Sequence, residues 1–195
     1  MNTTTYMNVP IARTSLTEAE IQSVLGPLRS GWLVQGPKVH EFEEKWSEFT
    51  SAKHSIAVTS CTTALHLSLA ALGLQPGDEV IVPAFTWIAT ANVVEHLGAT
   101  VVFCDVDLNT FNLDVEQLAR KITPKTKAII PVHIFGLAAE MNTINQLTKQ
   151  HGLWEVEDAA CGFGSHHQGQ HVGTLGETGC FSFHRRKAMP LAKAA

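Results

Sequence analysis

The amino-acid sequence predicts an α/β fold in which a mostly parallel sheet carries helices on both faces. From Ser55 onward, short runs rich in β-branched residues alternate with stretches of helical periodicity. Several of the helical stretches end at a glycine, which is a common signal at a helix C-terminus. No Gly-, Pro- or Ser-rich linker divides this part of the chain. The alternating part therefore indicates one sheet rather than two domains.

Two helices are expected before the sheet. Thr17-Glu18-Ala19-Glu20 is a capping box, and the apolar residues after it recur at helical spacing until Gly31. Pro37 suits the first position of a second helix. The apolar face of that second helix comprises Val39, Phe42, Trp46 and Phe49.

Strands and helices then follow in turn. The strands are predicted at residues 56–59, 79–82, 101–104, 128–132 and 153–157. The helices are predicted at residues 64–72, 88–97, 115–122 and 141–151. Ligands of such sheets bind beyond the carboxyl ends of the strands. The segments that follow the strands are therefore where a site is expected.

Composition narrows the possible partners. The chain has 195 residues and a net charge of -4, and its Lys and Arg residues are scattered. No nucleic-acid or membrane-binding surface is therefore expected. No apolar run approaches the roughly 18 residues of a membrane span, and residues 1–10 lack the layout of a signal peptide. We expect a cytoplasmic protein whose partners are small molecules or a second copy of the chain.

The cysteines and histidines give no metal signal. The four cysteines are far apart and form no CxxC pair, so neither zinc spacing nor a disulfide framework is expected. One histidine cluster, formed by His166, His167 and His171, occurs in a polar, Gly-containing stretch that is typical of a surface hairpin. No metal site is predicted.

Two strand ends carry candidate binding groups. Thr59 to Ala64 follows the first predicted strand and supplies hydroxyls and backbone amides at a helix start, where an anion can bind. The alternative is a plain helix cap. Trp87 follows the second strand and could stack on a flat cofactor ring, the alternative being a place in the core.

The last predicted strand ends in Glu157 and Asp158. A carboxylate in this position needs a partner that offsets its desolvation, such as a protonated pyridine nitrogen, unless it caps the next turn. Further along, Phe181–Lys187 contains a serine and a lysine. A carboxylate, a serine and a lysine can hold pyridoxal phosphate, with the lysine forming the Schiff base, the carboxylate facing the pyridine nitrogen and the serine binding the phosphate.

Taken in order, these motifs resemble the DegT/StrS-type nucleotide-sugar aminotransferases, which are pyridoxal-phosphate enzymes of fold type I. The resemblance extends over nearly the whole chain. It is carried by Ser30–Pro37, Cys61–Leu65, Pro83–Asn92, Pro131–Gly136, Glu157–Ala160 and Val172–Lys187.

The resemblance implies roles for individual residues. Lys187 would carry the Schiff base and later move the proton, Asp158 would pair with the pyridine nitrogen, and Trp87 would stack on the ring. The phosphate would be held by Thr62, Thr63 and Ser182. The implied reaction is transamination of a keto sugar linked to a nucleotide, with an amino acid, expected to be glutamate, as donor. It would serve amino-sugar or surface-polysaccharide biosynthesis, and the full-length enzyme would be a homodimer.

The chain departs from the family pattern in two places. Cys161 stands where the family usually has Gln or His three residues after the acidic residue. After Lys187 the family continues with Thr-Gly-Glu-Gly-Gly, which this chain lacks. Read back into codons, Met189–Ala194 becomes Met-Ala-Thr-Gly-Glu-Gly-Gly when a single G is restored after ATG. We hypothesise that residues 190–195 are out of frame.

That hypothesis sets the expected domain organisation. Residues 1–30 would form an N-terminal arm and first helix, and residues 31–195 a partial pyridoxal-phosphate-binding large domain without the small C-terminal domain. Three alternatives to an active aminotransferase are considered. A truncated inactive remnant would not bind the cofactor, and a pyridoxal-phosphate-dependent sugar dehydratase would have histidine in place of Lys187. A nicotinamide dehydrogenase would need a G-x-G-x-x-G motif after a strand, and the sequence has none.

Overall fold

The computed structural model describes residues 15–184 together with Lys187. The predicted arm before residue 15 and the tail at residues 190–195 lie outside the described residues.

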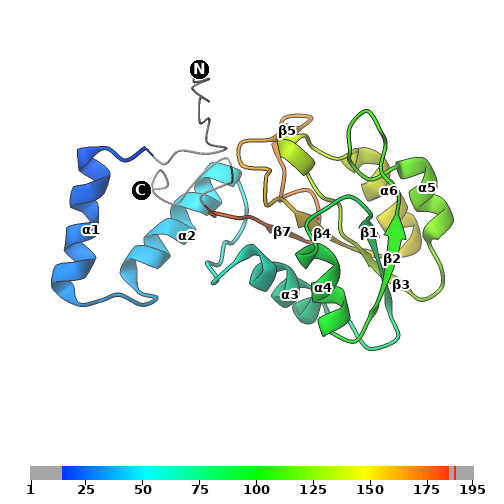
Figure 1. Cartoon of the computed structure of the whole chain (residues 1–195), viewed down its shortest axis with the longest axis horizontal. Helices are drawn as coiled ribbons and strands as arrows, with labels where there is room; N and C mark the ends of the chain where they lie inside the picture. Colours follow the sequence, from blue (N-terminus) through cyan, green and yellow to red (C-terminus); the bar gives the residue numbers. More distant parts are fainter. Residues whose placement is uncertain (1–14, 185–186, 188–195) are drawn as a thin grey trace, which may run out of the picture.

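A five-stranded parallel sheet forms the centre of the fold, with the strand order β2-β1-β3-β4-β7 (Figure 1). Each neighbouring pair is parallel. The strands are β1 (Glu79–Pro83), β2 (Thr100–Cys104), β3 (Thr126–Ile129), β4 (Trp154–Asp158) and β7 (Thr178–Cys180). The predicted α/β fold with a mostly parallel sheet is confirmed.

Helices cover both faces of this sheet, as predicted. Because side chains alternate along a strand, Val80 and Val82 face one side and Ile81 faces the other. The valine side packs against α3 (Cys61–Leu72) and α4 (Ala89–His96). The isoleucine side packs against α5 (Val115–Lys121) and α6 (Met141–His151). Each face thus has its own apolar core, as expected of a sheet covered by crossover helices.

Two helices precede this sandwich, as the sequence predicts (Figure 1). In α1 (Glu18–Ser30), the Glu20 carboxylate accepts a hydrogen bond from the Thr17 N–H, and no residue of the helix is buried. The next helix, α2 (Pro37–Thr50), begins at its proline. Its apolar face packs against later aromatic rings, and the Trp46 ring lies 5.7 Å from Phe163 and 4.9 Å from Phe183. This contact ties α2 to the segment that follows β7.

The strand predicted at residues 56–59 is wrong. Ile56 is 81% exposed, and the backbone there pairs with side chains instead of a strand. The Ala57 N–H donates to Glu43 Oε1 at 2.7 Å, and its carbonyl accepts from Gln35 Nε2 at 3.0 Å. Since side chains of α2 and of the loop before it satisfy these groups, the segment stays extended beside the sheet without joining it. The strand that sequence analysis did not predict is β7, whose three residues are too short for a periodic pattern.

The remaining elements are short. Residues Ile134–Gly136 form a 3-10 turn, η1, and β5 (His166–His167) pairs antiparallel with β6 (Gln170–His171). The predicted histidine hairpin is therefore present. Within residues 15–184 and Lys187, the four cysteines are unpaired and no group of three potential ligands could hold a metal ion. None of the described helices combines the length and the apolar character needed to cross a bilayer.

Close backbone packing at Gly179 gives a test of the fold. A Cβ built there would lie 2.2 Å from the Gly173 carbonyl oxygen, so Gly179→Ala should force β7 away from the preceding loop. We expect a loss of roughly 3 kcal/mol in the free energy of unfolding. In the control, Gly26→Ala, nothing lies within 4 Å of the new Cβ, and stability should be unchanged or raised by up to about 1 kcal/mol. Urea unfolding measures both, and equal stabilities of the two variants would contradict the packing described.

Candidate active site

Asp158 lies at the carboxyl end of β4, only 4% exposed. Its Oδ1 accepts from the Ala160 N–H at 3.1 Å and therefore caps the next turn, which was one of the two roles considered. Its Oδ2 accepts from the Thr90 hydroxyl at 2.8 Å. Burial raises the pKa of Asp158, while these hydrogen bonds and the charge of Lys187 act in the opposite direction. A cationic partner at this carboxylate would favour its charged form.

Thr90 was not assigned a role from the sequence, yet it holds Asp158 in place. It is fully buried in the first turn of α4, and its hydroxyl also lies 3.1 Å from the Thr86 hydroxyl. Its signal in the sequence is a hydroxyl within an otherwise small and apolar helix start, Ile88–Ala91. Such a hydroxyl needs a partner when buried, but the spacing along the chain does not reveal that the partner is 68 residues away.

The start of α3 presents the hydroxyls expected from the sequence. The Ser60 side chain accepts from the Thr63 N–H at 3.1 Å, so the plain-cap role is real. The Thr63 hydroxyl lies 3.0 Å from the hydroxyls of both Thr59 and Ser60. Thr62 is exposed beside them. The first N–H groups of a helix have no intrahelical acceptor, so this end can still bind an anion.

Ser182 is flanked by two aromatic residues. Phe181 and Phe183 both lie against Trp46 of α2, with ring centroids 5.0 and 4.9 Å away. Ser182 lies between these two rings in the sequence, and its hydroxyl is not part of the aromatic cluster. Among the described residues, the Ser182 hydroxyl accepts a hydrogen bond from the His184 N–H at 3.4 Å.

Lys187 lies close to the end of β4. Its Nζ donates to Cys161 Sγ at 3.2 Å, and its charge lowers the pKa of Asp158. The same strand ends meet the start of α3, because Cys61 Sγ donates to the Cys180 carbonyl at 3.5 Å. Burial raises the pKa of Cys180 to about 12 and also raises that of Cys61. The structure therefore brings together Asp158, Lys187 and the α3 N-terminus, and it gives Cys161 a contact with the lysine.

Trp87 is 75% exposed in the segment after β1, so its alternative place in the core is wrong. Its exposed ring is accessible to a ligand.

Glu157 points to the opposite side of β4 from Asp158 and is fully buried. Its carboxylate accepts hydrogen bonds from His133 Nε2 and from the N–H groups of Gly173, Leu175 and Gly176, at 2.6 to 2.9 Å. Burial alone would raise the pKa of Glu157, but these hydrogen bonds and the nearby His133 lower it overall. The sequence marked this residue as acidic without revealing its partners.

Comparisons with known proteins identify the family. The sequence profile of the DegT/DnrJ/EryC1/StrS aminotransferase family matches residues 14–194. The chain belongs to this family. Spore coat polysaccharide biosynthesis protein SpsC of Bacillus subtilis is 44% identical over 179 residues. That alignment covers 92% of this chain and 46% of SpsC, so the chain spans about half the length of this relative.

Solved structures of the family share the fold. The putative sugar aminotransferase Spr1654 of Streptococcus pneumoniae, in its PLP form, superposes with a TM-score of 0.89 at 37% identity, covering 95% of this chain and 51% of that one. The 3-amino-5-hydroxybenzoic acid synthase superposes with a TM-score of 0.87 at 38% identity, covering 95% of this chain and 48% of that one. The expected family and fold are thus confirmed.

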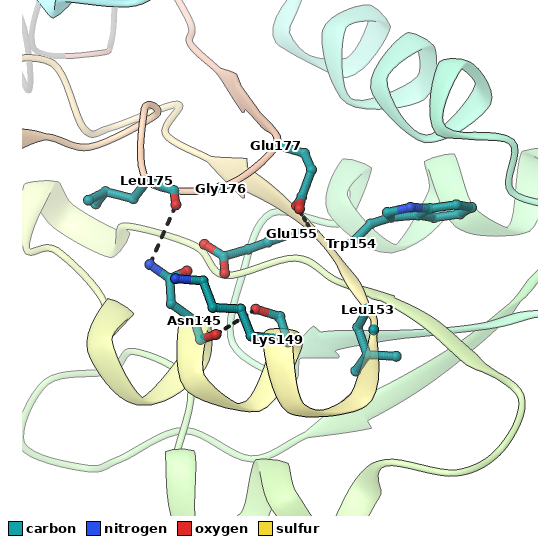
Figure 2. A pocket seen from close by; sticks show the side chains of 10 residues that line it. Asn145, Lys149, Leu153, Trp154, Glu155, Leu175, Gly176 and Glu177 are labelled. Atoms are coloured by element: carbon teal, nitrogen blue, oxygen red, sulfur yellow. Dashed lines mark hydrogen bonds between the residues drawn. The ribbon is translucent and has the colours of Figure 1, made fainter.

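A hollow of about 460 Å³ lies at the other end of β4 and is separate from this site (Figure 2). Trp154, at the start of the strand, borders it, whereas Asp158 is at the strand's end. Figure 2 shows the Glu155 carboxylate on the side of Asn145 and Lys149 of α6, whereas the Glu177 carboxylate accepts from the Glu155 N–H in the backbone of β4. Burial, aided by the charges of Glu157 and Glu177, raises the pKa of Glu155 to about 8.

This shift predicts a pH dependence of stability. Because the pKa of Glu155 is about 8 in the folded chain and the ordinary pKa of a glutamate is 4.5, the folded chain binds an extra proton between these pH values. The stabilisation is complete below about pH 4.5 and is lost as the pH rises through about 8. Glu155→Gln should remove this loss, which is roughly 5 kcal/mol.

Urea unfolding at about pH 5 and about pH 9 measures this effect. Glu48→Gln, at an exposed position of α2, is the matched control and should keep the wild-type pH dependence. An equally steep decline in Glu155→Gln would show that another group is responsible.

Proposed function

We propose that this chain provides the cofactor-binding part of a pyridoxal-phosphate-dependent sugar aminotransferase. The observation that carries the proposal is the buried Asp158 carboxylate at the end of β4, with the charge of Lys187 beside it. An acid and an amine in this relation suit a cofactor that needs a carboxylate at its ring nitrogen and a lysine at its aldehyde carbon.

The bound cofactor supplies an electron sink for the carbanion formed when the amino donor loses its α proton. Asp158 would keep the ring nitrogen protonated, and Thr90 would hold the carboxylate in its orientation through the 2.8 Å hydrogen bond. Lys187 Nζ would bond covalently to the cofactor and, once released, would take up the α proton of the amino donor. The Cys161 thiol, 3.2 Å away, would hold the free amine near this position.

The other predicted residues would bind the cofactor without taking part in proton transfer. Thr62, Thr63 and Ser182 would hold the phosphate, helped by the helix dipole of α3. Trp87 would cover one face of the ring, which its exposure allows.

The substrates and the assembly are part of the same proposal. A sugar substrate is supported by the family and by two relatives, the spore coat polysaccharide biosynthesis protein SpsC and the putative sugar aminotransferase Spr1654. The nucleotide on that sugar and glutamate as donor follow from the family resemblance. A cytoplasmic location is supported by the unpaired cysteines, because disulfides are rare in reducing compartments.

A second copy of the chain is the proposed protein partner. α1 exposes Ile21, Val24 and Leu28 along one face. At the carboxyl edge of the sheet, the rings of Phe85, Phe111 and Phe135 pack on each other at 5.4 to 6.2 Å and remain at least 40% exposed. Apolar patches of this kind usually mark an interface.

The first test locates the covalent bond to the cofactor. The protein is incubated with pyridoxal phosphate, reduced with borohydride and digested, and the labelled peptide is mapped by mass spectrometry. We expect the label on Lys187, and none in Lys187→Arg, which keeps the charge but cannot form the Schiff base. Label on another lysine, with none on Lys187, would exclude this assignment, and visible absorbance without any label would exclude a covalent cofactor.

The second test concerns the charge of Asp158. Asp158→Asn keeps the size and the Thr90 contact but removes the negative charge, so the half-reaction with glutamate should slow by about 100-fold or more while the cofactor still binds. The reaction is followed by the loss of the visible cofactor band. Asp105→Asn, an exposed position after β2, is the control and should react normally. A normal rate in Asp158→Asn would mean that another group protonates the ring.

A further inference from the structure

Glu157 and His133 form a buried pair whose protonation can be read from the contacts. The Ala139 N–H donates to His133 Nδ1 at 3.1 Å, so this nitrogen carries no proton. The proton of the neutral ring is therefore on Nε2, which donates to Glu157 Oε2 at 2.9 Å. Both side chains are fully buried. A charged carboxylate in such a place is stable because each of its oxygens is hydrogen-bonded.

The Glu157–His133 pair contacts both the backbone of Asp158 and the loop that leads towards Lys187. The His133 backbone N–H donates to the Asp158 carbonyl at 3.1 Å. His133 therefore contacts Glu157 through its ring and Asp158 through its backbone. On its other side, Glu157 accepts from the N–H groups of Gly173, Leu175 and Gly176. This loop leads into β7 and from there to Ser182 and Lys187.

We propose that Glu157, acting through His133 and the 173–176 loop, is a positioning residue that sets the direction of the Asp158 carboxylate relative to the segment carrying Lys187. Asp158 follows Glu157 directly and points to the opposite face of the sheet. A rotation of the backbone at Glu157 therefore turns Asp158 as well. The part of the inference that concerns the cofactor rests on the function proposed above, whereas the part that concerns the backbone does not.

The decisive variant is Glu157→Gln, which keeps the shape but puts an NH2 group where two donors already meet. Its matched control is Glu155→Gln, two residues earlier on the same face of β4 and also buried. In the cofactor-free protein, amide hydrogen exchange is measured at Ala160 and His133, whose N–H groups are donated to Asp158. We expect exchange at both amides to be about tenfold faster or more in Glu157→Gln and unchanged in the control.

The second measurement follows the cofactor itself. Titration with pyridoxal phosphate should show affinity lowered by about tenfold or more in Glu157→Gln, together with a shifted pH midpoint of the visible band. Borohydride should still label Lys187, because that residue is unchanged. The control Glu155→Gln should bind as the wild type does. A merely structural loss would lower affinity without moving the pH midpoint.

A second pair of variants covers the case in which Glu157→Gln does not fold. His133→Gln keeps an N–H donor for Glu157, so exchange at Ala160 should stay as in the wild type. His133→Leu removes the donor, so exchange at Ala160 should become faster. Unchanged exchange at Ala160 in Glu157→Gln, or in His133→Leu where Glu157→Gln does not fold, would overturn the positioning role. Absence of label on Lys187 in the wild type would instead overturn the proposed function, and the exchange data would still decide the role of Glu157.

Discussion

The hydrogen bonds of the Glu157 carboxylate fix the loop before β7 against β4, and the placement of the candidate site follows from them. The carboxylate lies in the interior with four hydrogen-bond donors around it, three of them backbone amides of one loop. Without these donors a charged group could not remain buried there. The loop is thus fixed against β4, and β7, which follows it, is set in register beside the strand that ends in Asp158. The aromatic cluster around Trp46 then holds the next residues of the chain.

The fold was largely predictable because short β-branched runs, such as Val80–Val82, alternate with stretches of helical periodicity. Where the prediction failed, the hydrogen-bond partners of the backbone decided whether a segment became a strand. Residues 56–59 have the composition of a strand, but Gln35 and Glu43 satisfy the backbone of Ala57 instead. For β7 the reverse applies, since Thr178–Cys180 has little β-pattern and becomes a strand because a neighbour offers free backbone groups.

The place of Asp158 at a buried strand end and the Ser60 cap of α3 could be expected from the sequence, while the cofactor-binding roles of the site residues stay predictions. The site was not predictable where a role depends on distant neighbours. Thr90 and His133 are ordinary residues in the sequence, and only the folded chain brings one to Asp158 and the other to Glu157. Residues of this kind are selected through their partners, so one sequence without its structure does not reveal them.

Glu157 and Asp158, adjacent at the end of β4, face opposite helix layers. The two layers therefore differ in what substitutions within them would affect. Libraries that vary α5 and α6 sample the surroundings of Glu157 and will be limited by folding yield. Libraries that vary the α3 and α4 layer sample the surroundings of Asp158 and will be limited by reactivity. A single peptide bond joins the two layers, so variants at Glu157 should be screened both for folding and for cofactor binding.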